Sequence, residues 1–191
     1  MNLPNILTIS RIFLTFIFVF FLLSPNFFAK ILALLIFSFA CLTDYYDGKI
    51  ARQRNLITNF GKLADPIADK ILILTPFLCF VQMKIVPAWM VILIISREFI
   101  ITGVRVFALS RGRALAAAKG GKHKTISQMV VIFFILLFLI GRSFGQRFNF
   151  WNVDFERISK WIIYISMLIA TALTLNSGVS YLWKNKKILT S

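Results

Sequence analysis

The sequence predicts an all-α membrane protein, a bundle of six transmembrane helices that forms a single domain over residues 1–191. Two observations predict this fold. Hydrophobic residues make up 59% of the 191 residues, which is too apolar a composition for a water-soluble domain. The chain also divides into apolar runs of about 20 residues, the length that crosses the hydrocarbon core of a bilayer. The six runs cover residues 5–23, 29–52, 61–82, 87–109, 125–141 and 158–183.

Breaks in hydrophobicity set the limits of these runs. The first run leads to Ser24-Pro25-Asn26, and no small-residue cleavage site follows, so we expect it to remain as a span and not to be removed as a signal peptide. A short polar connection separates the second run from the third. Residues 111–124, rich in Ala, Gly and Lys, precede the fifth run. Residues 141–157 separate the fifth run from the sixth, and their aromatic residues, with Trp151, suit an anchor at the membrane interface.

The distribution of Lys and Arg predicts that both termini face the cytoplasm. With that orientation, 13 of the 22 basic residues fall on the cytoplasmic side, namely Arg11, Lys49, Arg52, Arg54, Lys62, Arg111, Arg113, Lys119, Lys122, Lys124, Lys184, Lys186 and Lys187. The net charge of +15 then describes a basic inner surface held against anionic lipid. Nucleic-acid binding is not expected, because the charges are dispersed over membrane loops without a recognisable module.

Four of the seven acidic residues lie on the second and third runs, namely Asp44, Asp47, Asp65 and Asp69. A charged side chain at membrane depth costs at least ~2.5–3.5 kcal/mol, so four together need a compensating partner, and divalent metal ions are the natural one. Asp44 and Asp47 are three residues apart and Asp65 and Asp69 four apart, so each pair lies on one face of a helix. Two such faces opposed to each other predict a pocket of four carboxylates.

The residues beside the aspartates indicate the chemistry of this pocket. Gly48 and Gly61 remove side chains where a ligand or a neighbouring backbone must come close. Arg52 lies one turn beyond Gly48, where it can meet a phosphate. Carboxylate oxygens suit Mg²⁺ or Mn²⁺, and two such ions about 3.5–4 Å apart can clamp the attacking and leaving oxygens of a displacement at phosphorus. The alternative is a divalent-cation transporter, although the aspartates lie towards one face and no repeat is visible.

The spacing D-x2-D-G-x2-A-R-x8-G-x3-D-x3-D, from Asp44 to Asp69, resembles the signature of the CDP-alcohol phosphotransferases. The resemblance implies two Mg²⁺ or Mn²⁺ ions, CDP-diacylglycerol as the donor, and a homodimer in the bacterial cytoplasmic membrane with its active site facing the cytoplasm. By position, Asp44, Asp47 and Asp65 would be metal ligands. Asp69 would lie near the metals and also act as the catalytic base on the acceptor hydroxyl. The residues expected to line the CDP-lipid site are Asp44, Gly48, Ala51, Arg52 and Gly61.

Further segments are similar to the members of this family that use sn-glycerol 3-phosphate as the acceptor. These segments are Asn5–Arg11, Ser96–Phe99, Gly103–Arg105 and Gly121–Thr125 with Gln128. An acceptor that carries its own phosphate needs a second anion site, and Arg105, Lys122 and Lys124 are the candidates. Glu98 and Arg105 fall on one helical stripe. The two lysines open the fifth run, where a helix N-terminus favours an anion.

Other interpretations of these residues stay open. Lys122 and Lys124 can equally serve only as topology-setting charges, and Arg97 can equally form a structural ion pair. His123 is expected to be a solvated residue in a loop. The acceptor could also be serine, inositol phosphate or phosphatidylglycerol. Cys41 and Cys79 lie at different depths, so we expect no disulfide between them.

Overall fold

The computed structural model describes the backbone of residues 3–54, 59–111 and 120–190, and within it the side chains of residues 6, 8–44, 66–108, 110–111 and 124–186. The described backbone forms six helices and contains no strand, which confirms the all-α prediction. In chain order they are α1 (Leu3–Leu23), α2 (Phe27–Arg54), α3 (Asn59–Gln82), α4 (Ala88–Ser110), α5 (Gly120–Arg147) and α6 (Val153–Thr190). Each helix corresponds to one of the six apolar runs.

The predicted break at residues 141–157 is wrong at both ends, because α5 continues to Arg147 and α6 already begins at Val153. Aromatic packing explains the shorter connection. The rings of Phe144 and Phe148 lie 4.6 Å apart between centroids. Gly145 lets the chain fold back closely, since a Cβ on this glycine would lie only 2.6 Å from Cε3 of Trp151. These contacts hold the ends of α5 and α6 in helical form where composition alone suggested a loop.

Three helical segments in the described chain are long and apolar enough to cross a membrane, Phe27–Asp44, Lys124–Arg147 and Val153–Lys186. Thr8–Leu23 is a shorter apolar segment. These segments indicate a membrane protein, whereas the six-span arrangement stays a prediction. Charged residues inside α3 and α4, such as Lys70 and Glu98, set those two helices apart from the apolar ones.

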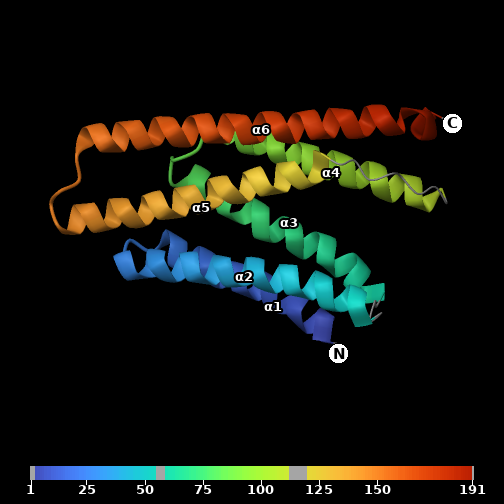
Figure 1. The fold of residues 1–191 in the computed structure, drawn as a ribbon, viewed down its shortest axis with the longest axis horizontal. Helices are drawn as coiled ribbons and strands as arrows, with labels where there is room; N and C mark the ends of the chain where they lie inside the picture. Colours follow the sequence, from blue (N-terminus) through green and yellow to red (C-terminus); the bar gives the residue numbers. More distant parts are fainter. Residues whose placement is uncertain (1–2, 55–58, 112–119, 191) are drawn as a thin grey trace.

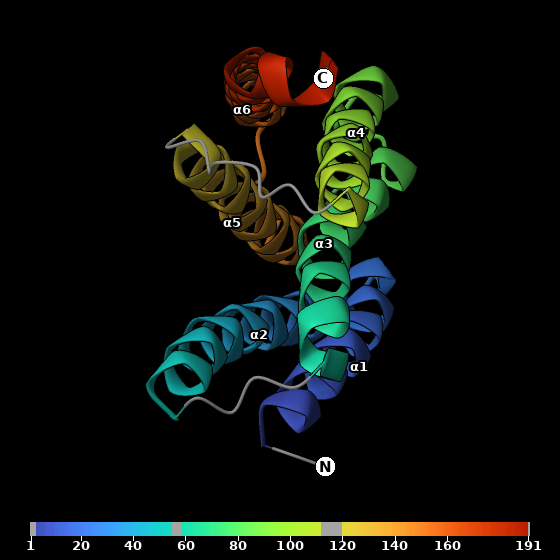
Figure 2. The same cartoon turned by 90° about the vertical axis from the view of Figure 1, so that its right-hand side faces the viewer.

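The helices form two groups that α3 joins (Figures 1 and 2). In one group, α1 packs against α2 and α3; in the other, α6 packs against α4 and α5. Contacts of α2 with α5, and of α3 with α4 and α5, hold the two groups together. The core between them is aromatic and aliphatic, with Phe18, Phe37, Phe77, Ile94 and Ile135 fully buried.

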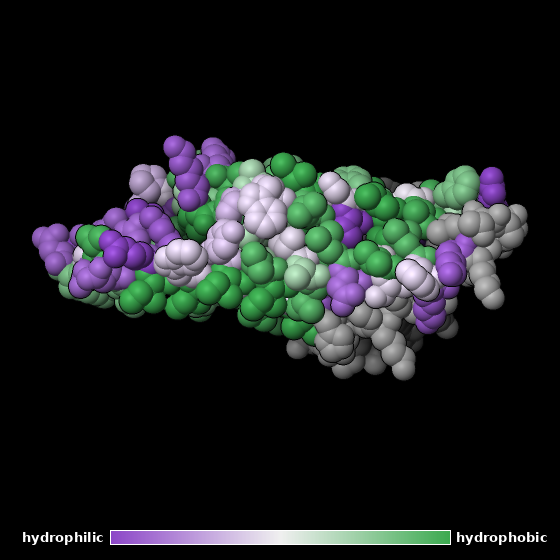
Figure 3. Space-filling view, turned by 90° about the horizontal axis from the view of Figure 1, so that it is seen from above, coloured by the Kyte–Doolittle hydropathy of each residue, from purple (hydrophilic) through white to green (hydrophobic). Residues whose placement is uncertain are grey.

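Both chain termini, the C-terminal end of α2 and the start of α3 lie at one end of the molecule (Figure 1). Along α1 the side chains of Phe13, Phe16 and Phe20 are 66–73% exposed, with a spacing that places them on one outward face. Figure 3 shows the α6 side of the molecule, where hydrophobic residues dominate the middle and most hydrophilic residues lie near the two ends. An apolar middle between polar ends is the surface expected of helices that cross a bilayer.

Candidate active site

The first and fourth aspartates of the motif meet at a buried arginine. One nitrogen of the Arg11 guanidinium, Nη1, lies 2.8 Å from Oδ1 of Asp44 and 2.8 Å from Oδ1 of Asp69. Asp44 belongs to α2 and Asp69 to α3, and α1, which carries Arg11, packs against both helices. The arginine therefore fixes where the two aspartate-bearing helices face each other.

The exposure of these three side chains differs sharply. Arg11 is only 2% exposed, whereas the side chain of Asp44 is 38% exposed and that of Asp69 is 55% exposed. A buried guanidinium needs carboxylate partners, because an unpaired charge in an apolar interior is very unfavourable. The carboxylates, in contrast, keep an open side from which a ligand can approach.

The sequence predicts Arg11 only as an orientation charge and does not predict its place between the aspartates. The sequence does contain an indication of this role. A charged residue in the middle of an apolar run usually marks a functional site and needs a partner of opposite charge. The partner itself could not be read from the sequence, since Arg11 and Asp69 are 58 residues apart.

The other residues predicted for this site lie outside the described side chains. They are Asp47, Gly48, Ala51, Arg52, Gly61 and Asp65. Their backbone is described and is helical, so Asp44 and Asp47 share one continuous helix, as do Asp65 and Asp69. The members of each pair, three and four residues apart, are therefore close to one turn apart on the same helix, as the sequence predicted.

The two described carboxylates supply the type of ligand that a hard divalent cation binds. Their Oδ1 atoms, from two different helices, converge on Nη1 of Arg11, so a metal ion would bind at their remaining, exposed oxygens. Oxygen ligands of this type are those that Mg²⁺ and Mn²⁺ prefer. Among the described side chains, no cluster of three or more His, Cys, Asp or Glu residues forms a complete metal site. A full set of four carboxylates would need Asp47 and Asp65 as well.

A second polar cluster joins α4, α5 and α6 around Glu98. Its Oε1 accepts a hydrogen bond from Nη1 of Arg97 at 3.1 Å and forms an ion pair with Lys124. Nη2 of Arg97 also donates to Oγ of Ser177 on α6 at 3.0 Å. Arg97 is therefore a member of a structural ion pair, one of the two roles left open by the sequence. Lys124 is 8% exposed, which is unusual for a lysine that would only set topology.

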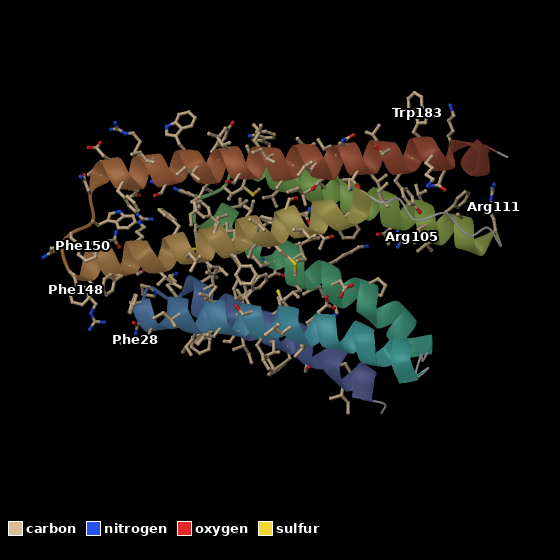
Figure 4. All side chains as sticks on the ribbon, viewed as in Figure 1. Phe28, Arg105, Arg111, Phe148, Phe150 and Trp183 are labelled. Atoms are coloured by element: carbon tan, nitrogen blue, oxygen red, sulfur yellow. The ribbon has the colours of Figure 1, made fainter. Side chains whose placement is uncertain are left out.

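Two further contacts relate this cluster to the predicted acceptor residues. Lys70, next to Asp69 in α3, donates a hydrogen bond to Oγ1 of Thr102 in α4. Arg105, one turn beyond Thr102, is exposed, and its guanidinium carbon lies 5.9 Å from the ring centroid of Tyr181 in α6. Figure 4 shows Arg105 towards the same end of the molecule as Arg111 and Trp183. The side chain of Lys122 lies outside the described set. The two cysteines are free, as predicted.

Comparisons with known proteins place this chain in a family. A sequence model of the CDP-alcohol phosphatidyltransferase family matches residues 1–175. The chain is 36% identical to CDP-diacylglycerol–glycerol-3-phosphate 3-phosphatidyltransferase of Bacillus subtilis (strain 168) over 200 residues, which cover 98% of this chain and 97% of that protein.

Two further relatives agree with this assignment. The protein of the same name from Rickettsia felis is 36% identical over 97% of this chain and 96% of its own length. A probable phosphatidylglycerophosphate synthase of Mycobacterium tuberculosis (strain H37Rv) is 38% identical over 73% of this chain and 68% of its own length. With the aspartate motif intact and the matches extending over nearly the whole chain, this protein belongs to the CDP-alcohol phosphatidyltransferase family.

Proposed function

We propose that this protein transfers the phosphatidyl group of CDP-diacylglycerol to sn-glycerol 3-phosphate, releasing CMP and forming phosphatidylglycerol phosphate. The observation that carries the proposal is the convergence of Asp44 and Asp69 on Arg11. It brings the two halves of the aspartate motif to one place in the fold. Relatives that match nearly the whole chain carry the name of this reaction. Membership of a transferase family also favours this activity over divalent-cation transport.

The donor would bind at the α2 half of the site. In the proposal, the CDP head lies along residues 44–52, with Gly48, Ala51 and Gly61 giving room and Arg52 meeting the diphosphate. The acyl chains would remain among the helices in the lipid. Two Mg²⁺ or Mn²⁺ ions held by Asp44, Asp47, Asp65 and Asp69 would polarise the diphosphate and offset the charge that develops on the departing CMP.

Asp69 would act on the acceptor. Its carboxylate takes the proton of the glycerol 1-hydroxyl, and the hydroxyl oxygen forms a bond to the β-phosphorus that carries the lipid. The bond from that phosphorus to the CMP oxygen breaks, and CMP leaves with the electron pair. Support for this role comes from exposure, since Asp69 is the more accessible of the two aspartates bound to Arg11.

The phosphate of the acceptor would bind at Arg105, Lys122 and Lys124. Arg105 is exposed and faces no described carboxylate, so its charge is open to an anion. Lys124 is held by Glu98, and this contact would position its ammonium group within the bundle. A neutral acceptor such as serine would leave these cations without a role, which is why an acceptor with its own phosphate is preferred over serine. The names of the relatives favour glycerol 3-phosphate over inositol phosphate.

The membrane arrangement is part of the same proposal. All six helices would cross the bacterial cytoplasmic membrane, with the aspartates opening to the cytoplasm and two copies forming a homodimer. The excess of Lys and Arg at the end that carries both termini supports this orientation. The charged residues of α3 and α4 have partners, which lowers the cost of placing these two helices in the membrane. Lys70 donates a hydrogen bond to Thr102, and Glu98 forms ion pairs with Arg97 and Lys124.

Release of CMP from CDP-diacylglycerol by the purified protein tests this function. We expect release with sn-glycerol 3-phosphate in the presence of Mg²⁺ or Mn²⁺, little release with glycerol, serine or inositol phosphate, and none after chelation of the metal. Equal release with glycerol would leave the family chemistry intact but refute the phosphate-bearing acceptor. No release with any alcohol would refute the transferase activity itself.

A further inference from the structure

A groove lies far from the aspartates, where the turn between α3 and α4 approaches the beginning of α6. It is lined by residues within 81–88 and 157–164 and has a volume of about 710 Å³. Small-molecule sites in proteins measure about 300–1,000 Å³, so the groove is large enough for a ligand. The reaction described above uses none of its residues.

The turn that forms one wall has a fixed conformation. Lys84 has a φ of 57°, in the left-handed region that glycine occupies more readily than a residue with a side chain. The amide of Lys84 donates to the carbonyl of Val81 at 2.9 Å, and the amide of Ile85 donates to the carbonyl of Phe80 at 2.9 Å. These bonds close the end of α3 and hold the lysine at the rim of the groove.

Positive charge surrounds the groove in excess. Lys84, Arg157 and Lys160 line it. Lys160 forms an ion pair with Glu156 at 2.8 Å, but Glu156 also faces Arg142 at 3.4 Å. Arg157 lies 3.9 Å from Asp154, and both side chains are at least 70% exposed, so this contact is weak. Lys84 forms no ion pair with any described side chain. Lys84, Arg142, Arg157 and Lys160 therefore stand against only two described carboxylates, Asp154 and Glu156, and an anion would offset this excess of positive charge.

The rest of the lining is apolar and aromatic. Trp161 and Tyr164 stand one turn apart on α6, with ring centroids 6.1 Å apart. Trp161 is 61% exposed. Trp and Tyr side chains gather where a membrane meets water, with lysine and arginine reaching to the same level. A free phosphate ion would use the cations alone, whereas a phospholipid uses the cations and the apolar wall together.

We propose that this groove binds one phospholipid with an anionic headgroup, in the leaflet opposite to the aspartate end. Its phosphate would lie between Lys84 and Lys160, and its acyl chains would run along Trp161 and the apolar residues of the α3–α4 turn. The site is separate from the donor site, because it lies at the other end of α3 and α6 from the aspartates (Figure 1). A zwitterionic lipid would bind less well, since it does not neutralise the excess of positive charge.

Quenching of Trp161 by brominated lipid tests the proposal in reconstituted full-length protein. Vesicles contain phosphatidylcholine with a rising fraction of brominated phosphatidylglycerol or, separately, of brominated phosphatidylcholine. The contribution of Trp161 is the difference in emission between the wild-type chain and the Trp161→Phe variant. We expect half-maximal quenching at a roughly tenfold lower fraction of the anionic lipid, the effect of about one charge-assisted contact.

Three variants test whether the preference for anionic lipid arises at the groove. Replacing both Lys84 and Lys160 by Gln should remove the tenfold preference, whereas Lys160→Arg should keep it. Arg147→Gln removes one cation at the same end but outside the groove, so it should leave the preference unchanged. CMP release by each variant reports on correct folding, because none of these residues lies at the aspartate site.

Three results would overturn the proposal. Equal quenching by the two lipids would mean that the groove only borders bulk lipid. An equal loss of preference in Arg147→Gln would assign the effect to general surface charge. Absence of quenching by either lipid, together with disulfide cross-linking between Lys84→Cys copies, would mean that a second copy of the chain covers the groove.

Discussion

At the scale of single residues, the Arg11 guanidinium links three helices through two carboxylates. A sequence shows the aspartates because they are rare, but Arg11 is one of many basic residues, and its role depends on a contact with α3. At 2% exposure it is the most buried of the cations whose side chains are described; Lys30 and Lys124 are also buried, and the other described cations are exposed or half-buried. The electrostatic balance at the aspartates therefore includes a built-in cation as well as any metal.

Replacing Arg11 by Gln should destabilise the protein most strongly when metal is absent. The change leaves Asp44 and Asp69 facing each other without the charge that lies between them, at a cost of about 1.5–3 kcal/mol for lost hydrogen bonds to a charged group. Added Mg²⁺ should restore more stability to this variant than to the wild type, because a divalent cation can replace the missing charge. Thermal unfolding in detergent with and without Mg²⁺ measures both effects.

The matched control for this experiment is Arg142→Gln. Arg142 is half-buried and paired with Glu156, but it lies at the other end of the molecule. Its variant should show the same response to Mg²⁺ as the wild type. An equal response to Mg²⁺ in Arg11→Gln and the wild type would argue against a cation site at the two aspartates.

Asp44→Asn and Asp69→Asn should impair different steps of the reaction. Asp44→Asn should abolish transfer and weaken binding of the CDP-lipid, because it removes a ligand of the metals that hold the donor; the same is expected of Asp47 and Asp65. Asp69→Asn should lose turnover while keeping much of the donor binding, because its main role is removal of the acceptor proton. Binding of CDP-diacylglycerol and release of CMP, measured side by side, separate the two. Equal loss of donor binding in both variants would make Asp69 chiefly a metal ligand.

Arg105→Gln should raise the KM for sn-glycerol 3-phosphate far more than the KM for the donor. Loss of a charge-assisted contact of about 1.5–3 kcal/mol corresponds to roughly 10- to 100-fold in apparent affinity. Arg111→Gln is the control, since Arg111 is an exposed arginine directly after the end of the same helix, with its guanidinium over Phe107. Steady-state kinetics that give similar acceptor KM values for both variants would place the phosphate site elsewhere.

At the scale of helices, hydrophobicity predicted every element, while packing decided where the elements end. All six runs became helices, since each is apolar for about 20 residues and is bounded by polar or turn-forming segments. The limits of α5 and α6 were not predictable in this way, because they depend on Gly145 and Trp151 meeting in three dimensions. The position of Asp44 and Asp47 on one helix followed from helical periodicity, whereas the ion pair between Glu98 and Lys124 depends on how α4 and α5 are arranged.

The contact between α4 and α6 should be sensitive to one methyl group. A Cβ on Gly178 would lie 2.9 Å from Cγ and 3.2 Å from Nε of Arg97, so Gly178→Ala must displace the arginine that binds Glu98 and Ser177. We expect a lower unfolding temperature and reduced activity. Gly103→Ala is the control, because nothing lies within 4 Å of its Cβ, and alanine favours a helix by about 1 kcal/mol over glycine. If Gly178→Ala matched Gly103→Ala in stability, the Arg97 cluster would not hold these helices together.

At the scale of the whole molecule, the aspartate site and the basic groove lie at opposite ends. The aspartates lie towards the end that carries both termini, while the groove lined by Lys84 and Lys160 lies towards the other. The sequence predicted the aspartate end from motif and charge distribution. The groove was not predictable, because its two walls come from segments about 75 residues apart and only the folded chain brings them together.

In the proposed reaction, this protein joins a phosphatidyl group to the 1-hydroxyl of glycerol 3-phosphate. The most direct test incubates the purified protein with CDP-diacylglycerol, Mg²⁺ and glycerol 3-phosphate labelled with ¹⁸O at the 1-hydroxyl, and analyses the lipid and nucleotide products by mass spectrometry. We expect one CMP for each new lipid, two phosphates in that lipid, and the label retained in it, because the acceptor oxygen attacks phosphorus. CMP formed without a two-phosphate lipid, or label lost from the lipid, would contradict the proposed reaction.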